Sequence, residues 1–161
     1  MIFVTVGHQM PFDRLVRAVD DWAAAHKRDD VFAQIGTTDY VPSHIEWSAT
    51  IDPSEFQQRI RDADAVVAHA GMGTILTAFE LGTPILVMPR RGALHETRND
   101  HQVATAERFL EMGRLAVAMD ENELPKMLDR VSDLTAGGAI SSQASPELLQ
   151  ALAAFIHQTD Q

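Results

Sequence analysis

The chain has 161 residues, of which 45% are hydrophobic and none is cysteine, and Asp plus Glu outnumber Lys plus Arg by 23 to 13. This length and composition predict a domain with a substantial core, and the absence of cysteine excludes disulfides and thiolate metal sites. The formal net charge of −10 argues against a broad basic face for nucleic acid.

The first residues of the chain lack the features of a secretion signal. Residues 1–16 have no basic stretch followed by a long apolar core, and no apolar run approaches the ~20 residues that span a bilayer. Together with the absence of cysteine, this predicts a soluble, cytoplasmic protein. Any recruitment to the inner face of the membrane is then expected to occur through a partner.

The first half of the chain predicts three strands and two helices. The predicted strands are residues 2–6, 31–35 and, with a weaker pattern, 45–47. The predicted helices are residues 12–25 and 53–64. The first strand is apolar and β-branched and ends at Gly7, and the first helix has amphipathic spacing. Asp52 is expected to cap the second helix, with Pro53 as its first residue.

The second half continues the alternation of strands and helices. The predicted strands are residues 65–68, 85–88 and 115–118, and the predicted helices are residues 72–81, 100–112, 121–134 and 146–157. In the helix over 100–112, Val103, Ala106 and Leu110 are expected to face inward. Residues 135–145 read as a loop before a peripheral helix rather than as a domain linker.

The strands of this pattern are short and apolar on both faces. Such strands, alternating with helices, are typical of a parallel sheet that helices cover on both sides. We therefore predict an α/β fold, a Rossmann-like parallel sheet of about six strands flanked by helices, with residues 1–161 as a single domain. The last helix, residues 146–157, is expected either to pack on this sheet or to dock on a partner.

A glycine-containing turn, "HAGMGT", lies at residues 69–74, where a strand gives way to a helix. In an open parallel sheet, ligands bind where strand ends run into helix N-termini. Gly71 and Gly73 would let the backbone approach a ligand, and the free N–H groups of the helix favour an anion. His69 and Thr74 could add side-chain donors. Taken alone, the two glycines fit a plain tight turn equally well.

Two segments together resemble a known family. Residues 69–89, "HAGMGTILTAFELGTPILVMP", and residues 99–109, "NDHQVATAERF", are similar to the donor-binding half of a GT-B glycosyltransferase, the C-terminal domain of family 28. The small soluble subunits of split glycosyltransferases resemble the chain more closely still. These include bacterial exopolysaccharide subunits of the PssE type and the eukaryotic catalytic subunit that adds N-acetylglucosamine to a dolichol-linked sugar. The similarity covers roughly residues 1–130.

The resemblance implies a set of donor-binding residues. The diphosphate of a UDP-sugar is expected at the turn, on His69, Gly71, Met72, Gly73 and Thr74. The sugar is expected at the later motif, on Asp100, His101 and Gln102. Many relatives place an acidic residue for the ribose six positions after the first loop glycine, where this chain has Thr77. Glu80, one helical turn further, is the alternative ribose contact, or it is an ordinary helix carboxylate.

Other residues near the predicted strand ends have a structural and a functional interpretation. Asn99 and Gln102 match a capping box, which would explain both without a ligand. Gly7 and His8 form either a plain turn or a contact to the acceptor or diphosphate. The sequence identifies no catalytic group: His8 is a candidate, but it is not assigned as the base, which in two-domain GT-B enzymes belongs largely to the other domain. Three arginines follow the predicted strand 85–88. They either form a solvated face paired with Glu96 or contact the acceptor or a carboxylate of the donor. These arginines are Arg90, Arg91 and Arg98.

The resemblance implies a donor-binding subunit of a two-chain, inverting glycosyltransferase. Such a subunit would transfer a hexose-type sugar from a UDP-sugar to a polyprenyl-diphosphate-linked acceptor in polysaccharide biosynthesis, with a membrane-anchored partner holding the acceptor. Little activity is expected from the chain alone, and no metal or other cofactor is required by this chemistry. The alternatives are a standalone nucleotide-binding or regulatory module and a UDP-sugar epimerase-like enzyme.

Overall fold

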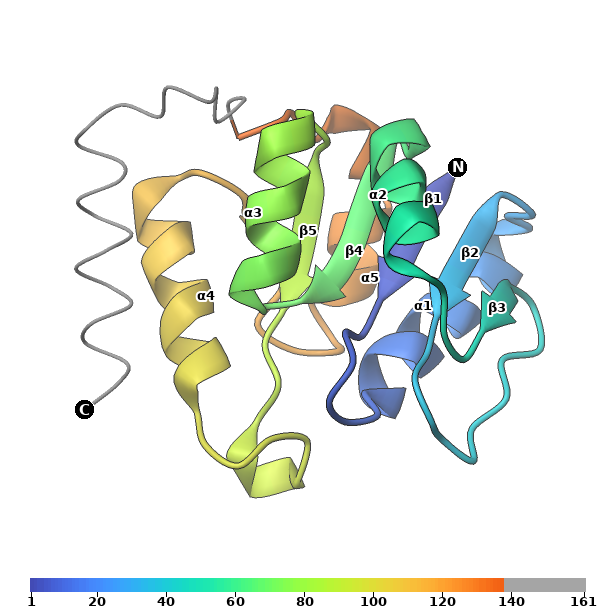
Figure 1. Cartoon of the computed structure of the whole chain (residues 1–161), viewed down its shortest axis with the longest axis horizontal. Coiled ribbons are helices and arrows are strands. Elements are labelled where there is room, and N and C mark those ends of the chain that lie inside the picture. Colours follow the sequence, from blue (N-terminus) through green and yellow to red (C-terminus); the bar gives the residue numbers. More distant parts are fainter. Residues whose placement is uncertain (138–161) are drawn as a thin grey trace.

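The computed structural model describes residues 1–137, which form a six-stranded sheet with helices on both faces (Figure 1). The strands are β1 (Ile2–Thr5), β2 (Val31–Gln34), β3 (Glu46–Ser48), β4 (Ala65–His69), β5 (Ile85–Met88) and β6 (Ala116–Val117). The helices are α1 (Asp13–His26), α2 (Pro53–Asp62), α3 (Met72–Leu81), α4 (His101–Met112) and α5 (Leu124–Leu128), with 3-10 turns η1 (Gly92–Leu94) and η2 (Val131–Asp133). The helix predicted at 146–157, and most of the loop predicted at 135–145, lie outside the described residues.

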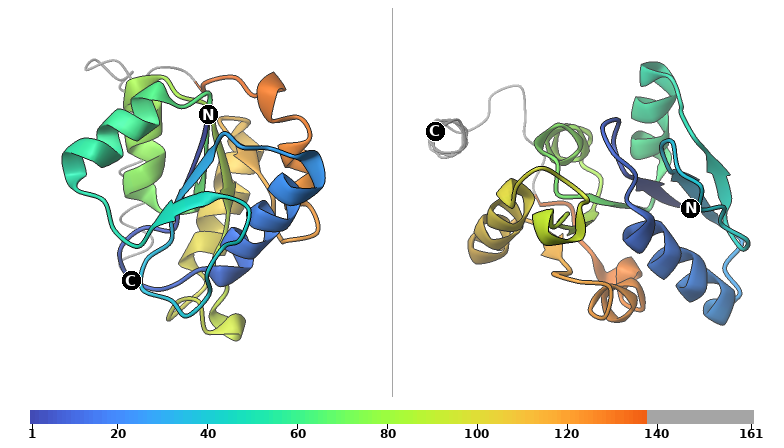
Figure 2. Two further views of the ribbon diagram at one scale, coloured as in Figure 1. Left: turned by 90° about the vertical axis from the view of Figure 1, so that its right-hand side faces the viewer. Right: turned by 90° about the horizontal axis from the view of Figure 1, so that it is seen from below.

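The sheet is parallel at every pairing, in the order β3-β2-β1-β4-β5-β6. In register, Val4 of β1 lies between Ala33 of β2 and Val67 of β4. This is the strand order of a doubly wound Rossmann sheet, and its direction reverses between β1 and β4. The prediction of a Rossmann-like α/β sheet is confirmed. Its carboxyl ends share one edge, at the bottom of Figure 1 and facing the viewer in the right-hand view of Figure 2.

Two apolar cores separate the sheet from its helices. Val4 and Val67 belong to the core under α1 and α5, which lie behind the sheet in Figure 1. The neighbouring residues Phe3 and Val66 point the other way, into the core under α2, α3 and α4. Because both faces are covered, these strand residues are fully buried and an all-apolar strand sequence is favourable.

One predicted helix is wrong in its extent. The sequence predicts a single helix over 121–134, but the structure has the five-residue α5 and then the separate 3-10 turn η2. Pro125 cannot donate a backbone hydrogen bond in the first turn. Beyond Leu128 the backbone hydrogen bonds join residues three positions apart, as in a 3-10 helix; for example, Arg130 N–H donates to the carbonyl of Met127 (3.1 Å).

The inward face of α4 also differs from the prediction. Leu110 was expected to face inward, but its side chain is 53% exposed, while Phe109 is buried. The ring of Phe109 packs edge-on against Phe79 of α3, with ring centroids 5.9 Å apart. Burying the larger aromatic ring sets the rotation of the helix, and Leu110 then points to solvent.

Candidate functional site

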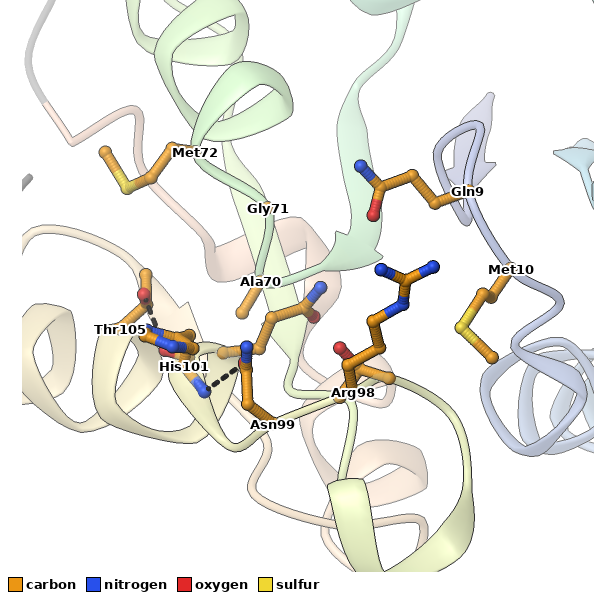
Figure 3. A pocket seen from close by; sticks show the side chains of 11 residues that line it. Gln9, Met10, Ala70, Gly71, Met72, Arg98, Asn99, His101 and Thr105 are labelled. Carbon is orange, nitrogen blue, oxygen red and sulfur yellow. Dashed lines mark hydrogen bonds between the residues drawn. The ribbon is translucent and has the colours of Figure 1, made fainter. Parts of the chain in front are cut away.

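A pocket of about 720 Å³ opens at the carboxyl edge of the sheet, between the loop after β1, the β4–α3 turn and the start of α4 (Figure 3). Its lining is mostly polar and contains no carboxylate, although the chain carries a net charge of −10. The lining residues are Gln9, Met10, Ala70, Gly71, Met72, Thr97, Arg98, Asn99, His101, Gln102 and Thr105. The pocket therefore lies at the reversal of strand order and suits an uncharged or anionic ligand.

The N-terminus of α3 has no side-chain cap. Gly71 is the capping residue, and the first intrahelical bond runs from Ile75 N–H to the Gly71 carbonyl (3.1 Å). Within residues 1–137, the N–H groups of Met72, Gly73 and Thr74 have no partner. By contrast, α2 is capped by a side chain, that of Asp52. Three unpaired donors and the positive end of the helix dipole favour an anion at this turn.

The two glycines of the turn have different roles. Gly71 has φ −88°, which any residue adopts, but a Cβ there would collide with the ring of His69. Gly7, next to the same ring, has φ +75°, and a Cβ there would lie 2.7 Å from His69 Nε2. A Cβ on Gly73 would meet nothing within 4 Å. Packing thus requires glycine at 7 and 71, and backbone access remains the explanation for Gly73.

The imidazole of His69 is mostly buried between these glycines. Its Nδ1 lies 3.2 Å from Nε2 of Gln102. Burial, with smaller effects from the nearby Arg90 and His8, lowers the pKa of His69 from 6.5 to about 4. The ring is therefore neutral at pH 7, with one N–H donor and one acceptor nitrogen.

Arg90 is a structural residue, contrary to the sequence interpretation. It is only 4% exposed, and its guanidinium donates to the backbone carbonyls of Val6, Met10, Pro11 and Glu96. Burial lowers the pKa of Arg90 to about 10. The prediction that Arg90 belongs to a solvated face is wrong. Its N–H groups, which the functional interpretation assigned to the sugar acceptor or a donor carboxylate, instead tie the loop after β1 to the loop after β5.

The other two arginines of this loop differ in their surroundings. The guanidinium of Arg91 donates a hydrogen bond to the Met119 carbonyl (2.9 Å), and the backbone N–H of Arg91 donates to the carboxylate of Glu96. That carboxylate is paired with Arg14 at 2.8 Å. Arg98 is exposed, and its side chain reaches into the pocket (Figure 3). Of the three arginines that the sequence singled out, only Arg98 lines the pocket.

The start of α4 brings the later motif to the pocket but does not form a capping box. Asn99 Oδ1 accepts from the N–H of His101 (3.1 Å), whereas Asp100 Oδ1 accepts from the N–H of Gly92 (2.9 Å). The side chain of Gln102 does not accept from the backbone N–H of Asn99 but bonds to Arg90 and His69, so that half of the predicted capping box is wrong. His101 and Gln102 line the pocket, but Asp100 does not.

Neither ribose candidate lines the pocket. The hydroxyl of Thr77 donates to the Gly73 carbonyl within α3 (2.8 Å). Glu80 is exposed near the far end of the helix, eight residues beyond Met72, or ~12 Å along the axis. Thr74 is buried below the turn. His8 borders a small adjoining cavity of about 50 Å³ that His69 also lines.

Some residues that build the site were missed by the sequence reading. Met10 and Thr105 line the pocket. Met10 could have been found because it follows the first strand, and Thr105 because it lies one helical turn after His101. Gln34 was read as part of an apolar strand. It is buried, accepts from the Thr5 hydroxyl (2.7 Å) and donates to the Gly7 carbonyl (3.1 Å). This buried network fixes the loop after β1.

Among residues 1–137, no group of three His, Cys, Asp or Glu side chains is placed to hold a metal ion. In the same part of the chain, no helix has both the length and the apolar character to cross a bilayer.

The fold and the site define the class of the protein. The glycosyltransferase family 28 C-terminal domain matches residues 1–144, almost the whole chain. The chain belongs to this family, and its sheet is the Rossmann-like half of a GT-B fold.

Particular proteins are similar to this chain. The human UDP-N-acetylglucosamine transferase subunit ALG13 is 29% identical over 124 residues, which is 71% of this chain and 10% of that protein. The solution structure of ALG13 superposes with a TM-score of 0.58 at 19% identity, covering 84% of this chain and 86% of that one. The glycotransferase of kitacinnamycin has a TM-score of 0.59 at 21% identity, covering 81% of this chain and 34% of that one. The chain thus spans about a tenth of the human relative and about a third of the kitacinnamycin glycotransferase structure.

Proposed function

We propose that this chain is the donor-binding subunit of a two-chain, inverting glycosyltransferase. The observation that carries the proposal is the uncapped N-terminus of α3 facing a pocket without carboxylates, in a domain of glycosyltransferase family 28. The donor is a UDP-sugar with a hexose-type ring. Because the human relative is named for UDP-N-acetylglucosamine, that nucleotide sugar is the first donor to test.

The diphosphate of the donor is proposed to lie against the first turn of α3. The N–H groups of Met72, Gly73 and Thr74 would donate to its oxygens, and Arg98 would supply a positive charge from the opposite side of the pocket. The sugar would extend toward α4, where His101 and Thr105 line the same pocket. Neither Thr77 nor Glu80 is proposed to contact the ribose, because neither residue lines the pocket.

In the reaction, a hydroxyl of the acceptor attacks the anomeric carbon, and the bond from that carbon to the UDP oxygen breaks. Negative charge grows on the departing UDP, where the helix N–H groups and Arg98 stabilise it without a metal or other cofactor. This chain also holds the donor in a fixed orientation. The acceptor, a polyprenyl-diphosphate-linked sugar in polysaccharide biosynthesis, and the base that activates it are proposed to come from a membrane-anchored partner subunit.

Sugar transfer by the purified chain, alone and combined with membranes of its source organism, tests the two-chain proposal. We expect transfer of labelled sugar from UDP-N-acetylglucosamine or another UDP-hexose to a lipid acceptor only in the combined sample. Robust transfer by the chain alone would contradict the need for a partner. Conversion of the UDP-sugar without any acceptor would instead indicate an epimerase, and UDP binding without transfer in either sample would favour a standalone nucleotide-binding module.

A further inference from the structure

The side-chain amide of Gln102 bridges two groups from different parts of the chain. Its Oε1 accepts from the backbone N–H of Arg90, just after β5, at 3.2 Å. Its Nε2 lies 3.2 Å from Nδ1 of His69, at the end of β4. The residue itself belongs to the first turn of α4, so the amide links three elements at the floor of the site.

The bridge fixes the direction of each hydrogen bond. A backbone N–H can only donate, so the amide oxygen of Gln102 must face Arg90, which settles which end of the amide is oxygen. The amide nitrogen can only donate, so Nδ1 of His69 must accept. In a neutral imidazole with Nδ1 as the acceptor, the proton is on Nε2.

We propose that Gln102 is a positioning residue that holds His69 in its Nε2–H tautomer, so that the ring offers a donor to the diphosphate of the nucleotide sugar. The inference rests on the proposed function for its ligand. It assigns Gln102 a role through His69 that is separate from any contact with the sugar.

The position of Nε2 supports this role. The atom lies between the two glycine turns, 2.7 Å from where a Cβ of Gly7 would be and 2.8 Å from where one of Gly71 would be. Within the described chain it has no hydrogen-bond partner. The one fully enclosed side-chain nitrogen or oxygen without a partner among residues 1–137 is Nε of Arg91, so Nε2 of His69 reaches accessible surface. In the opposite tautomer, a lone pair would face the anion.

The surroundings of His69 make the tautomer matter. The ring is buried and lies near Arg90 and His8, which both disfavour its protonation. The carboxylate that lines the adjoining cavity, that of Glu96, is paired with Arg14. The imidazole is therefore neutral at pH 7 and cannot offer two N–H groups, so Nε2 can donate to a ligand only when the single proton is on that nitrogen.

Nitrogen-15 NMR of the full chain, labelled at its seven histidines, tests the tautomer without any ligand. The His69 signals are identified by their loss in His69→Gln. We expect a protonated Nε2 and an unprotonated Nδ1 at pH 7.5. In Gln102→Glu, both carboxylate oxygens can only accept, so Nδ1 should become protonated. A protonated Nδ1 in the unmodified chain, or an unprotonated Nδ1 in the folded Glu variant, would overturn the inference.

Titration with UDP, which has no sugar, separates this role from a sugar contact. Gln102→Met keeps the length of the side chain but removes both hydrogen bonds. We expect it to weaken UDP binding up to roughly tenfold, as for one lost hydrogen bond, and to have little further effect in the His69→Gln background. Unchanged UDP affinity in Gln102→Met, with weaker UDP-sugar binding, would leave only a sugar contact. If the unmodified chain does not bind UDP at all, the proposed function fails, while the NMR result still decides the tautomer.

Discussion

The position of the His69 ring requires glycine at the neighbouring positions 7 and 71. An imidazole at the end of β4 occupies the space that a Cβ on Gly7 or Gly71 would need. Gly73, two residues further, has no such neighbour and stands in the first turn of α3. Two glycines that look equivalent in the sequence therefore differ in what a methyl group would disturb.

Alanine at each glycine separates packing from ligand access. Gly71→Ala should displace the His69 ring and lower the free energy of unfolding by about 1–3 kcal/mol, measured by urea denaturation. Gly73→Ala should leave that free energy unchanged or raise it by up to ~1 kcal/mol, since alanine favours the helix, yet weaken UDP binding. Loss of stability in Gly73→Ala, or undiminished UDP affinity in a folded Gly73→Ala, would contradict these assignments.

The buried neutral His69 makes stability depend on pH. The unfolded chain binds a proton at this residue near pH 6.5, but the native chain binds it only near pH 4. Between these values the unfolded state holds more protons, so stability falls as the pH falls. From pH 7 to pH 4.5 the loss from this group is about 2–3 kcal/mol. His69→Gln should lack that part of the pH dependence in urea denaturation; an identical pH profile in the variant would refute it.

At the scale of elements, the site depends on loops that are joined to one another. Arg90 connects the loop after β1 with the loop after β5 through four backbone carbonyls. Arg14 of α1 adds an ion pair to Glu96 in the latter loop. These contacts join the loops that carry Met10 and Arg98, whose side chains both line the pocket (Figure 3). Bonds made by Arg90 and Arg14, which do not line the pocket, therefore help to hold its loops in place.

Two arginine variants test this division. Arg90→Lys keeps a charge but cannot reach four carbonyls, so the free energy of unfolding should fall by about 2–4 kcal/mol. Arg98→Gln, at an exposed position, should change it by no more than ~0.5 kcal/mol and still weaken UDP binding. Thermal and urea unfolding, with UDP titration of each folded variant, give the comparison. Equal stability of Arg90→Lys and the unmodified chain would show that the carbonyl contacts are dispensable.

The sequence predicted elements best where local signals agreed. The bounds of α3 and β5 were predicted to the residue, with Gly71 and Gly82 flanking the helix. The helix over 121–134 was wrong at both ends: α5 begins only at Leu124, with Pro125 in its first turn, and beyond Leu128 the backbone changes to 3-10 bonding, which apolar spacing does not reveal. The face of α4 was wrong because spacing alone does not say whether Phe109 or Leu110 finds a partner; the ring of Phe79, thirty residues away, decides it.

The site was predictable in position but only partly in detail. A glycine turn after a strand places the pocket at the carboxyl edge, because parallel strands end at one edge. Three arginines within nine residues look alike in sequence, and only tertiary contacts separate buried Arg90 from exposed Arg98. Likewise, the bond between Gln102 and His69 joins residues 33 positions apart, which a local motif such as the capping box does not reveal.

At the scale of the whole molecule, the described residues form one half of a GT-B fold with an open pocket at one edge. The match to the kitacinnamycin glycotransferase covers about a third of that chain. A donor site on one half can be complete for binding while the acceptor side is supplied elsewhere. Nucleotide binding is therefore the property that the chain should show by itself.

Calorimetric titration of the full chain with UDP and with UMP, in a buffer containing EDTA, tests the central claim most directly. If the diphosphate binds at the N-terminus of α3, UDP should bind at one site per chain and at least about tenfold more tightly than UMP, because the second phosphate adds charge-assisted hydrogen bonds. Equal affinities for UDP and UMP, or no binding of UDP, would contradict the account.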